Sequence, residues 1–424
     1  MSGMPRPGRG ARVHVVGAGL AGLSAAVALA GRGWAVSLSD AAPQAGGRCR
    51  SYHDARLGMV IDNGNHLVLS GNPAVGRYLR AIGAEDRLAG PEQSAFPFFD
   101  LQRREGWVLR PNDGPLPWWV LHPGRRVPGT RAAEYLALAR LARRHPGRRI
   151  SEVLPCRGRL WEALLRPLLV SILNTPPEEA SADLAGAVVR ETLALGGAAM
   201  RPRVAIPSLA AAFVEPALGC LRAAGAEIRL GRRLRGLTLE GERVSALHFA
   251  GEEEMRLGAV DQVVLAVPPW VAAELLPSLT VPDRFGAILN AHFRHPAPAG
   301  APPVLGVVGG MAEWIFGFPD RLSVTVSAAD HLLEQESGAL AERLWHDVAA
   351  VHGLSGPLPP FRLVKERRAT FAATPEQDAR RPPARTAWRN LAVAGDWTAT
   401  GLPATIEGAL RSGEAAAAAL AARG

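Results

Sequence analysis

The order of apolar and polar positions along the chain predicts two kinds of structure. Short runs of apolar, largely β-branched residues are typical of strands buried in a parallel sheet. Such runs lie at 13–16, 34–39, 261–269 and 391–394, and residues 226–239 predict two further short strands. Residues 23–30 and the segment from about 404 onward are rich in alanine and leucine, which favours helices. The alternation predicts a Rossmann-like α/β fold whose strands come from distant parts of the sequence.

A glycine-rich turn joins the first predicted strand to the first predicted helix. Its G-x-G-x-x-G motif consists of Gly17, Ala18, Gly19, Leu20, Ala21 and Gly22. Gly17 permits the tight turn, Gly19 lets backbone approach a pyrophosphate, and Gly22 lets the helix pack closely on the strand. Leu20 and Ala21 open the helix end that faces the phosphates. Asp40 ends the second predicted strand, where a carboxylate accepts hydrogen bonds from ribose hydroxyls.

Two further motifs decide between nucleotide cofactors. One follows Asp40 after five residues and consists of Gly46, Gly47 and Arg48. The glycine pair suits a second backbone approach to a diphosphate with the arginine as counter-ion, which a plain NAD dehydrogenase does not need. The other motif, Gly395 and Asp396, ends the last predicted strand. Together they resemble the flavin amine oxidase and phytoene desaturase superfamily.

This resemblance implies FAD, held at both ends by one chain. It implies that Asp396 binds the ribityl chain and that N–H groups near Thr405 and Ile406 face the pyrimidine edge of the flavin, where the positive helix end stabilises negative charge. It also implies that Leu234 presents its backbone to adenine. Along the isoalloxazine it places the strip IDNGNHLVLSGN (61–72), with Asn63, Gly64 and Asn65 beside the ring. A decorated hairpin is the alternative interpretation of the strip.

The resemblance also divides the chain into interleaved domains. Residues 1–11 are expected to be a flexible N-terminus. The FAD-binding domain is expected to be discontinuous and to consist of residues 12–90, 200–270 and 385–424. An α+β substrate domain is expected from residues 91–199 and 271–384, which do not continue the Rossmann pattern.

The substrate domain is rich in apolar helical segments. One helical stripe, interrupted by Pro167, consists of Trp161, Leu164, Leu165, Leu168, Leu169 and Ile172. It fits a buried core helix and equally the wall of a long apolar tunnel. Residues 132–144 predict another helix with a basic end, near the adjacent Trp118 and Trp119. Tryptophan and arginine beside apolar faces suit peripheral contact with a bilayer, and a solvated basic face with two packed tryptophans is an equal alternative.

Four stretches resemble the squalene-associated branch of the superfamily, the hydroxysqualene dehydroxylases. They are DNGNHLVLSGN (62–72), LWEALLRPLLVSILNTPPEEAS (160–181), KERRATFAATP (365–375) and AGDWTATGLPATIEGALRSG (394–413). The resemblance covers nearly the whole chain. It implies reductive conversion of hydroxysqualene, a long-chain isoprenoid alcohol, to squalene in hopanoid biosynthesis, with hydride passing from reduced flavin N5 to an allylic carbon. The sequence does not indicate the electron donor.

Departure of the hydroxyl group requires a proton donor. His66 is the first candidate because imidazolium titrates near neutrality, with Asp62 to orient or charge it, and Glu407 is the second. Carotenoid desaturation stays open, since such enzymes share the fold, the flavin and an apolar tunnel. Amine oxidation is disfavoured because residues 285–293 lack the lysine that those oxidases place near N5. A non-catalytic, flavin-stabilised lipid carrier or scaffold is a further alternative.

Composition limits the number of domains and the kinds of ligand that the chain can bind. A chain of 424 residues, 48% apolar and 21% charged, can form two or three domains with real cores. The net charge is +9, but the basic residues are scattered arginines apart from Lys365, so nucleic-acid binding is not expected. The distant Cys49, Cys156 and Cys220 indicate neither a disulfide framework nor a metal site.

The uncharged run 13–31 imitates a signal peptide or a membrane span. Its glycines fall at the offsets of the phosphate-binding motif, and cleavage would destroy that motif. A cytoplasmic protein is therefore expected, or one that is peripheral on the inner face of the cytoplasmic membrane.

Overall fold

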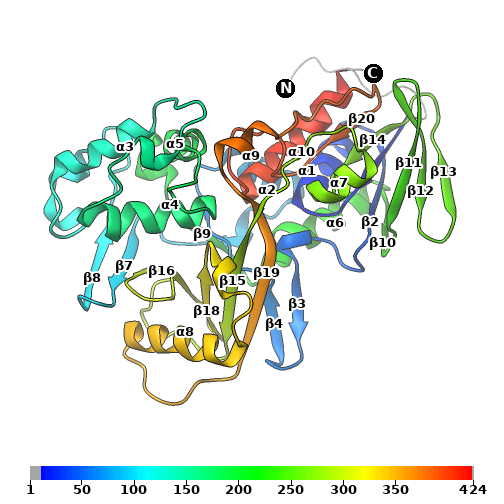
Figure 1. Ribbon diagram of the computed structural model, residues 1–424. Coiled ribbons are helices and arrows are strands. Elements are labelled where there is room, and N and C mark those ends of the chain that lie inside the picture. Colours follow the sequence, from blue (N-terminus) through cyan, green and yellow to red (C-terminus); the bar gives the residue numbers. More distant parts are fainter. Residues whose placement is uncertain (1–10, 423–424) are drawn as a thin grey trace.

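The computed structural model describes residues 11–422, and Figure 1 shows two main sheets with helices packed around each. The first sheet has five parallel strands in the order β10, β2, β1, β14, β20. Their respective bounds are Glu227–Leu230, Ala35–Asp40, Arg12–Val16, Gln262–Leu265 and Leu391–Val393. This is the Rossmann-like sheet that the apolar runs predict, assembled from both ends and the middle of the chain.

Different structures cover the two faces of the parallel sheet. Helices α1 (Leu20–Ala30), α6 (Glu215–Ala223) and α10 (Ile406–Ala421) share a core with one face. The antiparallel strands β11 (Leu234–Glu240), β12 (Arg243–Phe249) and β13 (Glu253–Arg256) form a small sheet on the other. Helices α1 and α10 lie in direct contact because Gly413 has no side chain, and a Cβ there would overlap the carbonyl oxygen of Ala21. The first and last helices of the fold are thereby locked together.

The second sheet has seven strands in the order β19, β15, β18, β17, β16, β7, β8. Their respective bounds are Phe361–Phe371, Phe285–Phe293, Leu322–Val326, Trp314–Gly317, Val304–Val308, Phe96–Asp100 and Glu105–Leu109. Neighbours are antiparallel except for the parallel pair β16 and β7. Helix α8 (Ser337–His352) packs on one face, and a group of helices, α3 (Leu136–Leu141), α4 (Arg166–Leu173) and α5 (Ala182–Glu191), lies on the other side (Figure 1).

Shorter elements connect these layers. Strands β3 (Ser51–Asp54) and β4 (Met59–Asp62) form a hairpin, and β9 (Pro202–Ala205) pairs with β5 (Val68–Leu69) and β6 (Leu88–Ala89). The remaining helices are α2 (Pro73–Ile82), α7 (Pro269–Leu275) and α9 (Pro375–Ala379). Residues 63–67 of the strip are irregular, and therefore the strip is not a hairpin of its own.

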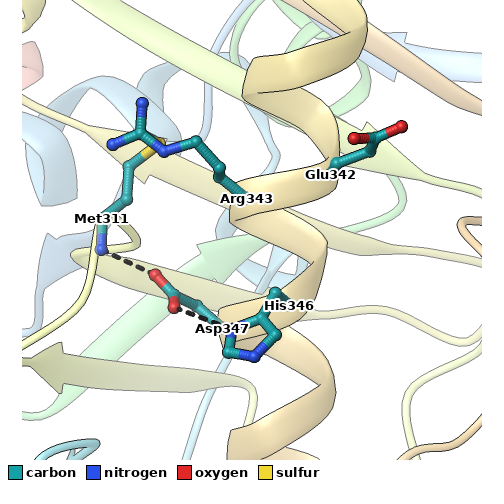
Figure 2. Close-up of a pocket in the computed structure, with 5 residues that line it drawn as sticks. All are labelled: Met311, Glu342, Arg343, His346 and Asp347. Atoms are coloured by element: carbon teal, nitrogen blue, oxygen red, sulfur yellow. Dashed lines mark hydrogen bonds and ion pairs between the residues drawn. The ribbon is translucent and has the colours of Figure 1, made fainter.

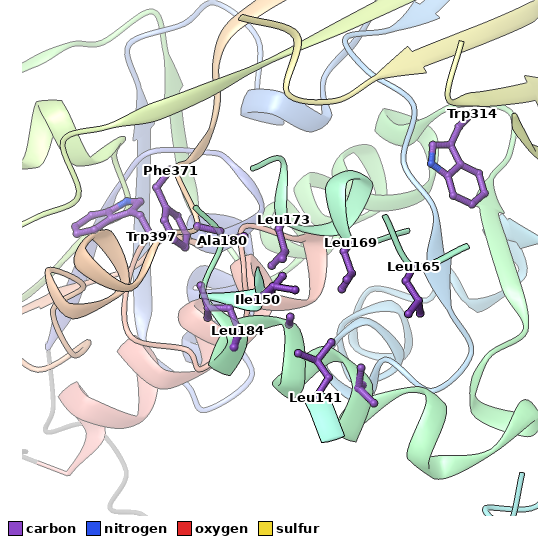
Figure 3. Packing of buried hydrophobic residues seen from close by; sticks show 14 of the residues in the cluster. Leu141, Ile150, Leu165, Leu169, Leu173, Ala180, Leu184, Trp314, Phe371 and Trp397 are labelled. Carbon is purple, nitrogen blue, oxygen red and sulfur yellow. The ribbon is translucent and has the colours of Figure 1, made fainter. Parts of the chain in front are cut away.

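The two predicted helices of the middle segment differ from their predicted forms. Residues Trp161–Leu165 form a π-helical turn, and α4 follows from Arg166 with Pro167 in its first turn, as expected where proline removes one backbone hydrogen bond. Leu165, Leu169 and Leu173 of this segment are buried in one apolar cluster (Figure 3), whereas the predicted stripe members Leu168 and Ile172 are only half-buried. The predicted helix 132–144 is shorter, with a 3-10 turn, η5 (Ala132–Tyr135), followed by α3.

The predicted flexible N-terminus, residues 1–11, lies outside the described residues except for Ala11, whose side chain is buried. Within residues 11–422, no helix is both long enough and apolar enough to span a membrane.

Asn174 clamps the end of α4 to the second sheet. It ends the helix in the left-handed conformation (φ 48°), and its buried amide donates to Thr370 Oγ1 (2.9 Å) and accepts from the Ala328 backbone N–H (2.7 Å). Gly286 is required beside it because a Cβ there would lie 2.8 Å from the Asn174 carbonyl oxygen. The first residue of the Asn-Thr-Pro-Pro-Glu segment (174–178) therefore connects the helix to the sheet through hydrogen bonds.

We expect Asn174→Ala to lower the free energy of unfolding by about 3 kcal/mol, because two buried partners lose hydrogen bonds and alanine disfavours positive φ. Urea unfolding followed by circular dichroism measures this change. Asn174→Gly is the matched control, since it lacks the amide but tolerates the backbone conformation, and it should be about 1 kcal/mol more stable than the alanine variant. An alanine variant as stable as the wild type would contradict the clamp.

Candidate active site

The glycine-rich turn stands between β1 and α1 with its backbone accessible. A Cβ at Gly22 would overlap the Gly17 carbonyl oxygen, and one at Gly17 would overlap that of Ala266, so these two glycines serve close backbone packing. Gly19 is different, because no atom lies within 4 Å of the position that a Cβ would take there. It precedes α1 without a side-chain cap, which leaves the helix N–H groups pointing into that space. This space suits a phosphate group.

The second glycine pair lies directly against the first. Gly46 N–H donates to the Ala18 carbonyl oxygen at 2.8 Å, and Gly19 and Gly46 form an isolated parallel bridge. Asp40 lies at the same place, where its carboxylate accepts from the N–H groups of Ala18 (2.6 Å) and Ala42 (2.7 Å). The two motifs, separated in sequence, thus form one continuous backbone surface.

The segment before Leu234 is tied to the same region. The N–H groups of Gly231 and Arg232 donate to the carbonyl oxygens of Ala42 (2.8 Å) and Asp40 (2.7 Å). Leu234 then begins β11 with its side chain buried in the core. Its predicted backbone contact with adenine is compatible with this placement and stays a prediction.

Arg48 joins the N-terminal motif to the C-terminal one. Its guanidinium donates to Asp396 Oδ1 at 2.7 Å and to the carbonyl oxygen of Ala369. Gly395 must be glycine, because a Cβ there would overlap the indole of Trp397, which donates to the Val267 carbonyl oxygen. The pairing brings the Gly-Gly-Arg and Gly-Asp motifs together, as two ends of one cofactor site require.

The N-terminus of α10 lies next to this pair in sequence. Thr405 caps the helix by accepting the Gly408 N–H at 3.0 Å, and the N–H groups of Thr405 and Ile406 have no acceptor in the described part of the chain. These N–H groups could donate to an electron-rich ring edge.

Glu407 has a structural role instead of the predicted acidic one. Its buried carboxylate accepts from the N–H groups of Ala74 and Val75, each at 3.0 Å, and pairs with Arg411 at 3.1 Å. It thereby caps the N-terminus of α2. The carboxylate is directed at α2 and Arg411.

The strip 61–72 contacts the second sheet through two asparagines. Asn65 donates its side-chain amide to Thr325 Oγ1 (3.2 Å) and its backbone N–H to Asn290 Oδ1 (3.3 Å), and Thr325 Oγ1 donates to Asn290 Oδ1 (2.8 Å). We call Asn65, Asn290 and Thr325 the polar bridge. Asn65 Oδ1 is sealed from solvent and has no hydrogen-bond partner in the described residues. Beside the bridge, Asn63 donates to Glu366 Oε2 at 3.1 Å, and Gly64 leaves room for the Asn290 amide.

The structure separates Asp62 from His66. Asp62 is buried and accepts from Ser51 Oγ (2.6 Å) and the Leu209 N–H (2.9 Å), with Arg321 at 3.6 Å, so its carboxylate does not orient His66. Burial lowers the pKa of His66 to about 4, with the nearby Arg48 charge acting in the same direction. The imidazole is therefore neutral at pH 7, contrary to the predicted imidazolium acid, because the ring lies in a poorly solvated site beside a cation.

A row of side chains leads away from the polar bridge across the second sheet. Asn290, Thr325, Trp314, Gly306, Phe98 and Trp107 are direct cross-strand neighbours, which places them on one face. The row is polar on β15 and β18 and aromatic from β17 to β8. Phe98 stacks on Trp107 and meets Trp314 edge-on, each at 5.6 Å between ring centroids, and its ring fills the space above Gly306.

Helix α4 covers this row. Leu165, Leu169 and Leu173 belong to the same buried cluster as Trp314 and Phe98, and Figure 3 shows this cluster reaching Phe371 and Trp397, the residue that follows Asp396 in the sequence. An apolar layer therefore begins at the cofactor motifs and extends between helix and sheet. We define this layer as the apolar corridor.

Glu313 directly precedes Trp314 of the row and belongs to no motif of the sequence. Its carboxylate accepts the Ser327 backbone N–H at 2.7 Å. Ser327 follows Thr325 by two residues, about 6.6 Å along an extended strand. Burial raises the pKa of Glu313 to about 7, against the lowering effects of hydrogen bonds from Ser327 and of the Arg166 charge. It is a carboxyl group that retains a proton close to neutral pH.

Three other residues of the site also lack a sequence motif. Asn290 and Thr325 stand in ordinary strand patterns, and only the strand register brings them to Asn65. Arg381 is buried and donates to the Asp396 carbonyl oxygen (3.2 Å) and to Thr400 Oγ1 (2.8 Å). The sequence alone does not identify this arginine as a site residue, because arginines after a helix are common and its burial is evident only in the folded chain.

A surface hollow beside α8 is separate from this site (Figure 2). It is lined by Met311, Glu342, Arg343, His346 and Asp347. The Asp347 carboxylate accepts the N–H groups of Met311 (2.6 Å) and Ala312 (2.9 Å) and thus holds a loop. The hollow lies on the α8 side of the sheet, opposite the polar bridge. No group of three or more metal-ligating side chains occurs within residues 11–422.

Comparison with known proteins agrees with this architecture. Residues 20–421 match the model of the family described as flavin containing amine oxidoreductase. The chain belongs to this flavin-containing amine oxidoreductase family. Membership shows a flavin-dependent oxidoreductase.

Within the amine oxidoreductase family, curated relatives are similar over almost their full length. A hydroxysqualene dehydroxylase of Zymomonas mobilis is 50% identical over 95% of this chain and 97% of its own. One of Rhodopseudomonas palustris is 52% identical over 96% of this chain and 97% of its own. Cyclohexylamine oxidase from Brevibacterium oxydans has the same fold, with a TM-score of 0.69 at 17% identity over 97% of this chain and 98% of its own. The predicted resemblance to the squalene-associated branch is confirmed.

Proposed function

We propose that this protein is an FAD-dependent hydroxysqualene dehydroxylase, which converts hydroxysqualene to squalene. The identity of about 50% with curated hydroxysqualene dehydroxylases over some 95% of the chain carries this proposal. The apolar corridor that ends at a polar bridge supports it, because the substrate is a long hydrocarbon with one hydroxyl group.

The residues of the site fit FAD. The open backbone at Gly19 would receive the pyrophosphate, Asp40 the adenosine ribose, and Asp396, fixed by Arg48, the ribityl chain. Thr405 and Ile406 would donate their free N–H groups to the pyrimidine edge. When bound in its reduced form, FAD would supply the hydride for this chemistry.

The chain's own residues would orient the substrate and exclude water. The side chains of the apolar corridor would move apart to admit the isoprenoid chain between α4 and the aromatic row, where hydrocarbon is favoured over water. The unpartnered Asn65 Oδ1 would accept the substrate O–H, and this hydrogen bond would fix the carbon that bears it. The neutral His66 would serve as a wall or hydrogen-bonding residue and not as the acid.

We propose Glu313 as the proton source for the departing hydroxyl group, in place of His66 and Glu407. Its pKa of about 7 means that the acid form is present below pH 7 and is lost as the pH rises above 7. Wild-type turnover should therefore decline toward alkaline pH. Glu313→Gln keeps an acceptor for Ser327 and should lower the single-turnover rate about tenfold at pH 7 and flatten the pH profile.

The pH profile of squalene formation by FAD-loaded protein checks this role. Glu342→Gln, an exposed carboxyl group on α8, is the control and should retain the wild-type profile. If Glu313→Gln keeps the alkaline decline, then another group supplies the proton.

An anaerobic single-turnover experiment tests the proposed reaction. The purified yellow protein is reduced, hydroxysqualene is added, and flavin absorbance and squalene are followed together. Flavin reoxidation matched one-to-one by squalene supports the function. If the oxidised protein instead desaturates phytoene, the protein belongs to carotenoid metabolism. If its flavin is neither oxidised nor reduced by any isoprenoid, the protein is a carrier and not an enzyme. Because substrate and product are both lipids, we propose that the protein works in the cytoplasm as a peripheral protein on the inner face of the cytoplasmic membrane.

A further inference from the structure

Four large apolar side chains are exposed in the segment that leads up to and begins α3, a helix at the outer end of the helical part of the molecule (Figure 1). Leu116 is 78% exposed, Trp118 46%, Leu121 67% and Leu136 68%. They come from η3 (Trp118–Leu121), the residues before it, and the start of α3. We call these four residues the apolar patch. Soluble surfaces rarely gather such residues within one short segment, and an exposed apolar patch indicates a contact surface.

Buried residues beneath hold the apolar patch outward. Trp119 and Tyr135, the sequence neighbours of Trp118 and Leu136, meet edge-to-face at 5.2 Å between ring centroids, and both are buried. Tyr135 Oη also accepts the Val127 N–H at 3.0 Å. The Trp118 indole is itself supported, because the Arg125 guanidinium lies 4.7 Å from its ring centroid. The two adjacent tryptophans therefore differ: one anchors the segment and the other presents its ring to solvent.

The same segment is strongly basic. Residues 115–144 contain six arginines and a single acid, Glu134. Arg131, Arg140, Arg143 and Arg144 are exposed, and none of these four pairs with a carboxylate side chain in the described part of the chain. Other exposed arginines of the described chain, such as Arg229, Arg256 and Arg389, are paired, whereas Arg235 on β11 is exposed and unpaired but has no basic cluster with exposed tryptophan around it. Unpaired cations around exposed leucine and tryptophan complement an anionic lipid surface.

The apolar patch is continuous with the apolar corridor. Trp119, Tyr135 and Leu141 belong to the same buried cluster as Leu165, Leu173 and Trp397. Figure 3 follows this cluster from Leu141 of α3 through Leu173 to Trp397. One buried apolar cluster therefore extends from beneath the apolar patch to the flavin motifs. A lipid surface at the patch would lie at the outer end of this cluster.

We propose that Leu116, Trp118, Leu121 and Leu136, with the surrounding arginines, dock the protein on an anionic phospholipid bilayer. The leucines and the indole enter the acyl boundary, and the guanidinium groups bind lipid phosphates. This docking depends on exposure and charge alone, and therefore it can fail or succeed independently of the proposed dehydroxylation.

Vesicle flotation of the flavin-loaded protein tests the docking. The wild type should float with phosphatidylcholine vesicles that contain phosphatidylglycerol, much less with pure phosphatidylcholine, and less as salt is raised. The double variant Trp118→Ser, Leu121→Ser and the triple variant Arg140→Glu, Arg143→Glu, Arg144→Glu should each reduce the bound fraction at least about tenfold. Their flavin spectra and thermal unfolding should match the wild type, because every substituted side chain is exposed.

The matched control is Arg235→Glu with Leu239→Ser, an exposed arginine and leucine on β11. It should float like the wild type. The proposal is overturned if the wild type ignores anionic vesicles, if it binds both vesicle types equally, or if the control loses as much binding as the patch variants. A salt-insensitive dimer that forms through the patch without vesicle binding would likewise overturn it and assign the surface to a second copy of the chain.

Discussion

Gly19→Ala is expected to weaken FAD binding by about a hundredfold or more while leaving the fold intact. Gly19 has φ −72°, a conformation that alanine adopts, and no protein atom lies within 4 Å of the position that the new methyl group would take. The protein itself therefore has room for the methyl group. Only a ligand in direct contact with the backbone would be displaced by it, as the pyrophosphate of FAD would be.

Two measurements together check this expectation. Flavin titration followed by fluorescence gives the affinity, and thermal unfolding of the flavin-free protein shows whether the fold has changed. Gly219→Ala is the control, because Gly219 lies in α6 with no neighbour within 4 Å, and it should bind FAD normally. Gly22→Ala should instead unfold the turn, since its Cβ overlaps Gly17. If the Gly19→Ala variant binds FAD with unchanged affinity, the pyrophosphate does not bind at Gly19.

The Rossmann-like sheet is predictable because each of its strands carries a local pattern. Residues 13–16 and 391–394 are apolar on both faces, as a central parallel strand must be, and glycine spacing marks the turn after the first. The joining of the two ends is predictable from the resemblance alone. The structure supplies its physical basis in Gly413 against α1 and Arg48 against Asp396.

The acid–base residues are not predictable, because pKa values depend on burial and neighbours that a sequence does not show. His66 has the right side chain for an acid, but its surroundings keep it neutral at pH 7. Glu407 follows the flavin-facing residues in sequence, yet its carboxylate faces α2. Glu313 stands in no motif, and burial beside Ser327 raises its pKa to about 7.

The polar bridge shows the same limit for substrate recognition. The strip indicates Asn65, with a role beside the flavin, but its partners Asn290 and Thr325 lie on strands distant in sequence. Their contact depends on the register of β15 against β18, which is set by the pairing of whole strands. Local patterns define elements, whereas the site depends on how those elements are aligned.

Asn65→Leu is expected to slow squalene formation about a hundredfold while flavin stays bound. Asn65 Oδ1 is a sealed acceptor without a partner in the described residues, which costs free energy unless a ligand supplies a donor. The substrate hydroxyl is such a donor, and the product lacks it. Leucine has a similar size, and the bond between Thr325 and Asn290 does not need the Asn65 side chain, so the rest of the polar bridge should persist.

The decisive comparison is between substrate and product. In the Asn65→Leu variant, the turnover of hydroxysqualene should fall, but inhibition by squalene should be unchanged, because squalene contacts only the apolar corridor. A general loss of structure would weaken both, and a variant that loses its flavin would assign Asn65 to the cofactor as a ring-contacting residue. A variant with wild-type turnover would show that the hydroxyl group is held elsewhere. The contrast between an alcohol and its own deoxygenated product thus isolates a single hydrogen bond from the large apolar contact that both ligands share.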